Sequence, residues 1–199
     1  TAVYLYRSGR SGLQEDHAKF EMTGGTIKGG EYGLKHTHLN EVSLSGGKIS
    51  GGENQPDVYM AWEKNSVSGT AKFTVKGNFP FASMKIESAS KINEIDFTKA
   101  TATGEENLQI NLPWDGNETG ANMKLFKAST SNYRDLLKHI TLSGGKTPIF
   151  AVYNERMISE NPETTEIYAF SAPNLYTVHV KYYTKSSEAA PFYDEYLLN

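Results

Sequence analysis

His36 and His38 are the side chains best placed for metal chemistry, because only one residue separates them. On an extended strand, residues two apart point to the same face, so both imidazoles could ligate one ion. A zinc site needs at least three protein ligands, and only Glu31 or Glu41 offers a nearby third group. We interpret this segment as an exposed polar corner. Asp115 begins DGNE, a fragment of a calcium loop without its closing glutamate, so we expect no metal and no cofactor.

Carboxylates are the next candidates for chemistry, since polysaccharide-cleaving enzymes use paired acids along one exposed face. Asp57, Glu87 and Asp96 could share such a face, but the sequence does not fix their register. The chain has no cysteine and no G-x-S-x-G nucleophile elbow. Its 199 residues are also few for a polysaccharide-active β-helix enzyme. We therefore expect no enzymatic activity and keep that enzyme class as the least favoured alternative.

Composition narrows the partners and the location of the protein. The net charge of −3 supplies no basic field for nucleic acid. No apolar run reaches the roughly 18 residues of a membrane span, so we expect no membrane insertion. The chain contains 18 Gly and 12 Tyr and opens at Thr1 without a methionine. These features favour a cleaved leader and a β-rich protein that is extracellular or at the cell surface.

A short segment recurs along the chain and indicates how it is built. It reads KFEMTGG at 19–25, EVSLSGG at 41–47 and HITLSGG at 139–145, with a weaker copy, KFTVKGN, at 72–78. Each copy alternates polar and apolar residues before its glycine, which predicts a half-buried strand followed by a turn. The first two copies are 22 residues apart. A period of this length with several short strands is typical of a parallel β-solenoid, whose units must stack to bury their apolar faces.

The apolar residues of the first two repeats are expected to stack as ladders in the core, about 4.8 Å apart. These residues are Phe20, Met22, Ile27, Tyr32, Leu34, Val42, Leu44, Ile49, Val58 and Met60. Short alternating segments continue from 66 to 127, and 131–138 is the one helix that we expect, with Ser131 as its cap. We divide the chain into an N-terminal strand or arm (1–12), a β-solenoid domain (13–170) and a C-terminal strand with an aromatic arm (171–199).

The strings MTGGTIKGGEYGL (22–34) and LSGGKISGG (44–52) resemble the Gly-rich repeat proteins of bacterial cell surfaces that form right-handed parallel β-helices. The resemblance covers roughly residues 18–158 and leaves out both termini. It implies an all-β fold, a short right-handed parallel β-helix, with a β-sandwich as the alternative. It implies little about function, because such proteins include adhesins and fibrous surface proteins, and fold does not fix function.

Aromatic and apolar residues crowd both termini, which favours an intermolecular interface. A solenoid also has two open ends whose backbone groups need partners, and a terminal arm can add a strand to a neighbouring molecule. Head-to-tail contacts of this kind grow filaments when they do not close. Arms that fold back onto their own solenoid are the alternative. The predicted interface residues are Val3, Tyr4, Leu5, Tyr6, Val178, Val180, Tyr182, Tyr183, Phe192, Tyr193 and Tyr196.

The sequence thus predicts a non-enzymatic extracellular structural protein that binds copies of itself head to tail, forming a filament or surface layer. The alternative is a cell-surface adhesin or carbohydrate-binding module that holds a glycan or a host surface. Sugar rings stack on exposed aromatic side chains, so the glycan contacts would be Tyr59, Trp62 and Trp114.

Overall fold

A computed structural model describes most of the chain, and every structural statement below concerns this part. Its residues are 1–5, 18–37, 40–61, 72–87, 94–102, 107–114, 122–144, 148–154, 163–171, 178–182 and 193–197. Strands make up nearly all of its regular structure, and the helix that it contains has six residues. The prediction of an all-β fold is therefore confirmed.

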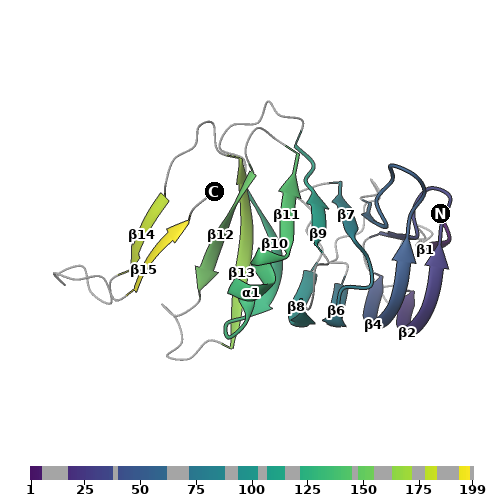
Figure 1. Cartoon of the computed structure of the whole chain (residues 1–199), viewed down its shortest axis with the longest axis horizontal. Helices are drawn as coiled ribbons and strands as arrows, with labels where there is room; N and C mark the ends of the chain where they lie inside the picture. Colours follow the sequence, from purple (N-terminus) through teal and green to yellow (C-terminus); the bar gives the residue numbers. More distant parts are fainter. Residues whose placement is uncertain are drawn as a thin grey trace, which may run out of the picture.

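Two sheets contain most of the strands (Figure 1). All strands of sheet A are parallel, and in spatial order they are β1 (Val3–Leu5), β3 (Leu34–His36), β5 (Val58–Met60), β7 (Ser83–Ile86), β9 (Leu108–Asn111) and β11 (Ile140–Ser143). The parallel strands of sheet B, in the same order, are β2 (Lys19–Lys28), β4 (Glu41–Ser50), β6 (Lys72–Asn78), β8 (Glu94–Thr101) and β10 (Asn122–Ser129).

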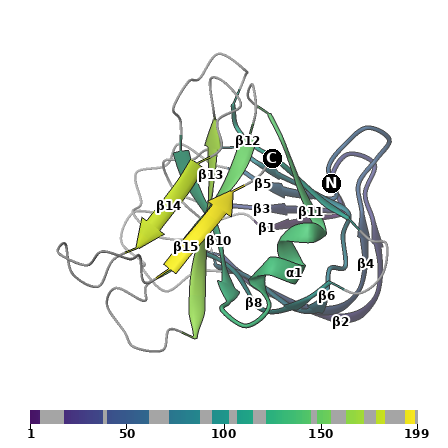
Figure 2. The ribbon, with the colours of Figure 1, turned by 60° about the vertical axis from the view of Figure 1, so that its left-hand side comes forward.

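Consecutive strands alternate between the sheets from β1 to β11, so each pass through both sheets adds one strand to each. The two layers are visible in Figure 2, with sheet B curving beneath sheet A. We call each sheet B strand and the sheet A strand that follows it a unit, so that unit 1 is β2 with β3 and unit 2 is β4 with β5. The stack begins with β1 and β2, which we call its N-terminal end.

The register confirms the predicted ladders of the first two units. Met22 pairs with Leu44, Ile27 with Ile49, and Leu34 with Val58. Leu34, Leu44 and Val58 are fully buried, which places these ladders in the core between the sheets. The core continues through the predicted alternating segments of the later units, where the buried aromatic rings of Phe73, Phe79, Phe81, Phe97 and Phe126 contact one another in series.

The prediction that the first glycine pair of each repeat ends the strand is wrong. β2 and β4 continue through Gly24–Gly25 and Gly46–Gly47 and have ten residues each. Gly25 and Gly47 adopt φ angles of 83° and 91°, and the pairing register shifts at this point. A left-handed residue inside a strand produces a bulge that bends the strand and keeps it in the sheet. The chain leaves the strand only at the second glycine pair of each repeat.

The helix expected at 131–138 forms as α1 (Tyr133–Lys138), but its cap is different. Asn132 rather than Ser131 occupies the N-cap position, and no side chain caps the helix. Tyr133 and Leu136 are buried against the core, so tertiary packing stabilises this short helix. α1 lies in the connection from β10 to β11.

The C-terminal part leaves the parallel pattern. β13 (Thr164–Ser171) pairs antiparallel with β10, and β12 (Pro148–Asn154) pairs antiparallel with β13, so both extend sheet B. β14 (Val178–Tyr182) and β15 (Tyr193–Leu197) form a separate two-stranded antiparallel sheet. The last strands of the two sheets are thus β11 in sheet A and β12 in sheet B.

Candidate interaction surfaces

The N-terminal end of the stack presents the first edge of both sheets. β1 is at one end of the strand order of sheet A, and β2 is at one end of sheet B. Residues 3–5 of the segment predicted as an N-terminal arm (1–12) are thus already paired within their own chain, with Tyr4 opposite Lys35 and Leu5 opposite His36. Val3 packs against the core and Leu5 is buried in it, so only the outer edge of β1 and the 44% exposed Tyr4 face outward.

Glycines at this end differ sharply between the first two units. A Cβ atom on Gly46 of unit 2 would lie 2.6 Å from the Thr23 carbonyl oxygen of unit 1, and one on Gly52 would lie 2.0 Å from that of Gly30. Close approach of the preceding backbone therefore requires glycine at these two positions. The corresponding residues of unit 1 are Gly24 and Gly30, and a Cβ on either would have no described heavy atom within 4 Å.

A buried polar cluster attaches β1 to the rest of the stack. The Thr37 hydroxyl and the Asn40 side-chain amide both donate to the Leu5 carbonyl oxygen, at 2.8 and 3.0 Å. The Oδ1 atom of Asn40 accepts a 2.9 Å hydrogen bond from the backbone N–H of Ala18, just before β2. Thr37 and Asn40 are almost completely buried. One asparagine therefore connects the end of β1, the start of β2 and the corner of unit 1.

His36 belongs to the core, so the interpretation of its segment as an exposed corner is wrong. Its side chain is fully buried, with Leu5 and Met60 at the paired positions of the neighbouring strands. Nε2 donates to the Asn40 carbonyl oxygen at 2.9 Å, whereas Nδ1 has no hydrogen-bond partner among the described residues. Burial lowers the pKa of His36 to about 4, because a charged ring would lose its hydration.

His38 and Asp115, the other two metal candidates, lie outside the described residues. Among the described residues, no three His, Asp or Glu side chains group closely enough to hold a metal ion.

A row of alternating tyrosines and lysines runs across the outer face of sheet A. The register aligns Tyr4, Lys35, Tyr59 and Lys85 on successive strands. The Lys35 ammonium lies 4.6 Å from the Tyr4 ring centroid and 5.8 Å from that of Tyr59, and the Lys85 ammonium lies 5.4 Å from the Tyr59 ring. These are cation–π distances, so we call this set the tyrosine–lysine row.

Tyr59, a predicted glycan contact, is held within its own surface. Tyr32 lies against it with ring centroids 4.6 Å apart. Burial raises the pKa of Tyr59 above its usual range, and a hydrogen bond with the Glu87 carboxylate raises it further. Neighbouring side chains thus occupy much of the ring surface on which a sugar would stack.

The structure describes one of the two tryptophans that were predicted to contact a glycan. Trp114 is only 8% exposed and packs in the core, which corrects its assignment as a glycan contact. Trp62 lies outside the described residues.

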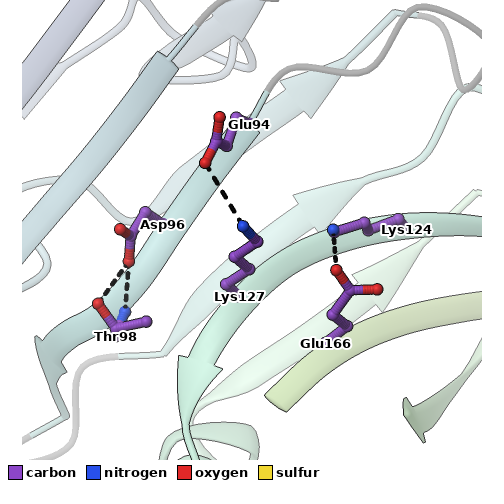
Figure 3. Close-up of polar contacts among 6 residues, drawn as sticks. All are labelled: Glu94, Asp96, Thr98, Lys124, Lys127 and Glu166. Carbon is purple, nitrogen blue, oxygen red and sulfur yellow. Dashed lines mark hydrogen bonds and ion pairs between the residues drawn. The ribbon is translucent and has the colours of Figure 1, made fainter. Parts of the chain in front are cut away.

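The outer face of sheet B carries a row of alternating charge. Its paired positions are Lys19, Glu41, Lys72 and Glu94, on β2, β4, β6 and β8. Glu41 forms ion pairs with Lys19 at 3.4 Å and with Lys72 at 3.7 Å. Lys127 of β10 continues the row through a 3.5 Å ion pair with Glu94 (Figure 3). The alternating signs place unlike charges on neighbouring parallel strands, which favours this register.

A more enclosed ion pair joins β10 to β13. Lys124 donates to the Glu166 carboxylate (Figure 3). The Tyr168 hydroxyl donates to the other oxygen of this carboxylate at 3.0 Å. Burial alone would raise the pKa of Glu166, but the hydrogen bonds from Lys124 and Tyr168 outweigh burial and lower it. The ion pair therefore connects β13, which pairs with β12, to β10, the last parallel strand of sheet B.

The three carboxylates considered for catalysis do not form one acidic face. Asp57 accepts hydrogen bonds from the backbone N–H groups of Gly51, Ala82 and Ser83 at 2.8, 2.8 and 3.0 Å. Asp96 of sheet B accepts from the N–H and hydroxyl of Thr98 at 2.8 and 2.6 Å (Figure 3). Glu87 follows β7 in sheet A and hydrogen-bonds Tyr59. Asp57 and Asp96 thus hold the backbone locally in two different parts of the fold.

A cleft of about 720 Å³ lies where unit 2 is longer than the unit that follows it. β4 pairs with β6 only from Glu41 to Leu44, and its second half, Ser45–Ser50, forms one wall of the cleft. Asn78–Ala82, the end of β6 and the chain leading to β7, form the opposite wall. Phe79, Phe81 and Leu108 are buried beneath it.

The predicted C-terminal interface residues fall mainly on the separate hairpin. Val178, Val180 and Tyr182 belong to β14, and Tyr193 and Tyr196 to β15, with Tyr182 opposite Tyr193. The remaining predicted interface residues, Tyr6, Tyr183 and Phe192, lie outside the described residues.

Sequence reasoning missed three features of these surfaces: the polar cluster around Asn40, the tyrosine–lysine row and the alternating charges. The last two leave a signal in the sequence once the repeat is aligned, since Lys19 and Glu41 are 22 residues apart and Lys35 and Tyr59 are 24 apart. Asn40 has no counterpart that the repeat itself would identify.

Comparisons with protein-family models, curated proteins and solved structures find no match to this chain. No helix in the described residues has the length and hydrophobicity needed to cross a bilayer.

Proposed function

We propose that this chain is a non-enzymatic extracellular structural protein that self-associates through its terminal strands into a filament or surface layer. We further propose that its two sheets are the faces of a short right-handed parallel β-helix. Regular alternation of parallel strands between the sheets, with apolar ladders in register, supports this architecture.

The observation that carries the function is the open N-terminal end. β1 and β2 each have a strand partner on one side only, among the described residues. An unprotected edge recruits another strand unless charge, a bulge or a cover prevents it. β2 has ten residues, so its outer edge still offers backbone groups on both sides of the bulge at Gly25. Addition of strands from another copy would satisfy its backbone groups, and repeated addition would grow a filament.

The test is negative-stain electron microscopy with light scattering on the full chain and on a chain lacking residues 184–199. Regular fibres from the full chain would support self-association. Their loss on truncation, while the circular dichroism of the core remains, would assign the docking strands to the C-terminal hairpin, whereas fibres that persist would assign them to β11 and β12. A monomer near 22 kDa at every concentration would overturn it. Removal of β1 is a poorer test, because Leu5 belongs to the core and its loss would destabilise the fold.

A cell-surface adhesin is the second candidate, and the tyrosine–lysine row favours it. Lys35 and Lys85 place two positive charges on the outer face of one sheet, which suits an extended anionic glycan better than stacking on Tyr59 alone. An adhesin would stay monomeric and bind acidic glycans on an array. Replacing both lysines with glutamine would abolish that binding and leave the melting temperature nearly unchanged.

A further inference from the structure

We propose that the surface around Gly24 and Gly30 is an acceptor site, shaped to receive the backbone of a second copy of this chain. The inference rests on the proposed self-association and deepens it, because it names the surface on which the second copy docks and the residues that make docking possible.

The geometry of unit 2 shows what these glycines accommodate. Gly46 and Gly52 lack a positive φ angle, so conformational freedom does not explain them. Their Cβ atoms would lie 2.6 and 2.0 Å from carbonyl oxygens of unit 1, closer than any side chain tolerates. In unit 2, glycine at these positions therefore marks the close approach of a preceding unit.

Unit 1 repeats the same glycines without the neighbour. Gly24 and Gly30 stand 22 residues before Gly46 and Gly52, and neither has a positive φ. Nothing described lies within 4 Å of the Cβ position at either residue. Gly24 lies inside β2, where glycine is less favourable than alanine unless a close approach or an unusual backbone conformation requires it. Gly29 differs, because its Cβ would meet the Tyr32 carbonyl of its own unit. Gly24 and Gly30 therefore preserve a docking surface that unit 1 itself does not fill.

A second copy of this chain is the partner that fits the surface. β12 is antiparallel to β13, which is antiparallel to β10, so β12 runs in the same direction as β2. β11 likewise runs parallel to the other strands of sheet A, including β1. The far edges of both sheets thus match the direction of the edges at the N-terminal end. A head-to-tail contact would continue both sheets with parallel pairing, and it would grow a filament when it does not close into a ring.

Charge on the outer face of sheet B agrees with this arrangement. The alternating row begins at the open end with Lys19, whose side chain is 66% exposed although it pairs with Glu41. Glu41 and Lys72, inside the row, each pair in register with opposite charges on both flanking strands. A strand docked beside β2 would find Lys19 available for a carboxylate on its own outer face.

The inference is tested with the double variant Gly24→Ala/Gly30→Ala in the full chain. Neither methyl group meets an atom of its own unit, so we expect circular dichroism to match that of the wild type and the melting temperature to be no lower. Each methyl group would meet a docked backbone as it would at Gly46 and Gly52. We therefore expect the concentration for half-maximal assembly, measured by light scattering, to rise at least tenfold. Gln109→Ala, exposed on the internal strand β9, is the matched control and should assemble normally.

Different outcomes separate this inference from the function on which it rests. A wild-type chain that stays monomeric overturns both. A double variant that assembles as readily as the wild type overturns the acceptor site alone and leaves self-association standing. Hydrogen exchange of the wild type gives a second measurement that needs no variant. Amides of 19–30 should exchange at least tenfold more slowly in the assembled state, and equal rates in both states would also overturn the acceptor site.

Discussion

A Cβ atom on Gly52 would lie 2.0 Å from the carbonyl oxygen of Gly30, the residue at the same position of the preceding unit. The two residues are 22 apart in the chain, which is one full repeat. The repeated glycines are therefore required by close packing between successive units rather than by the conformation of each unit. A substitution has a different effect according to which member of the pair it changes.

Gly52→Ala should lower the free energy of unfolding by about 1–3 kcal/mol, because the new methyl group forces two backbone segments apart. Gly30→Ala should change it by less than about 0.5 kcal/mol, since the same methyl group would have no described neighbour. Urea unfolding of both variants below the assembly concentration measures the difference. Equal losses in the two variants would contradict a role for these glycines in packing between units.

His36 should make the fold sensitive to mild acid. Its pKa is about 4 in the folded chain and about 6.5 when unfolded, so between these values the unfolded chain binds more protons. Stability from the neutral ring is complete above about pH 6.5 and is lost as the pH falls toward 4. The two pKa values differ by about 2.5, which corresponds to roughly 3 kcal/mol of folding stability. Denaturant unfolding at several pH values between 4 and 7 would measure it.

The matched variant for this prediction is His36→Leu. Leucine suits the position, because Leu5 and Met60 occupy the neighbouring places of the same ladder, and the Asn40 carbonyl keeps its bond from the Lys72 amide. We expect the variant to lose less stability than the wild type over this pH range. If both chains lose the same amount of stability as the pH falls, groups other than His36 cause the acid sensitivity.

The ladders could be predicted from the sequence because apolar side chains that alternate and repeat every 22 residues have few ways to be buried together. Met22 over Leu44 is the clearest example. The bulge at Gly25 could not be predicted in the same way. A glycine pair fits a turn and a bent strand equally well, and only pairing with the next strand decides between them.

Two features of the candidate surfaces, the burial of His36 and the contacts of Asn40, could not be predicted for a different reason. His36 resembles an exposed polar residue until its ladder with Leu5 and Met60 is known, since burial depends on partners outside its own repeat. Asn40 bonds Leu5, 35 residues earlier, and no periodic pattern encodes a contact of that kind. Polar residues of the core are thus poorly predicted where each one is satisfied by a partner that is distant in sequence.

Leu44→Asp should prevent stable folding, because Leu44 is fully buried and pairs with Met22 on one side and Val75 on the other. An unpaired carboxylate there would lose its hydration without gaining a partner, at a cost of several kcal/mol. Ser43→Asp is the control, since Ser43 points to the opposite face of the same strand and is only partly buried. Circular dichroism and thermal melting compare the two. A native melting temperature for Leu44→Asp would show that the register of this ladder is wrong.

The alternating charges of sheet B should contribute little to stability, and in a salt-dependent way. Glu41→Gln removes ion pairs with Lys19 and Lys72, both of which are largely exposed. Such pairs are worth at most about 1 kcal/mol each in low salt, and added salt screens them. We expect a loss below about 1 kcal/mol at 20 mM NaCl that shrinks at 500 mM NaCl. A larger loss that persists in high salt would mean that Glu41 acts through packing rather than charge.

Asn40→Ala should detach β1 while leaving the later units folded. The substitution removes the amide that donates to the Leu5 carbonyl and the oxygen that accepts from the Ala18 amide, both buried in the folded chain. The Ala18 amide would lose its acceptor, at a cost of about 1–3 kcal/mol, and the Leu5 carbonyl would keep only the Thr37 hydroxyl. The three-residue edge strand should therefore open more readily. Hydrogen exchange should therefore quicken at residues 3–5 and remain slow in β6 and β8. Thr37→Val removes one bond to the same carbonyl and should have a smaller effect in the same direction. Unchanged exchange at 3–5 in Asn40→Ala would mean that backbone pairing with β3 holds β1 without the polar cluster.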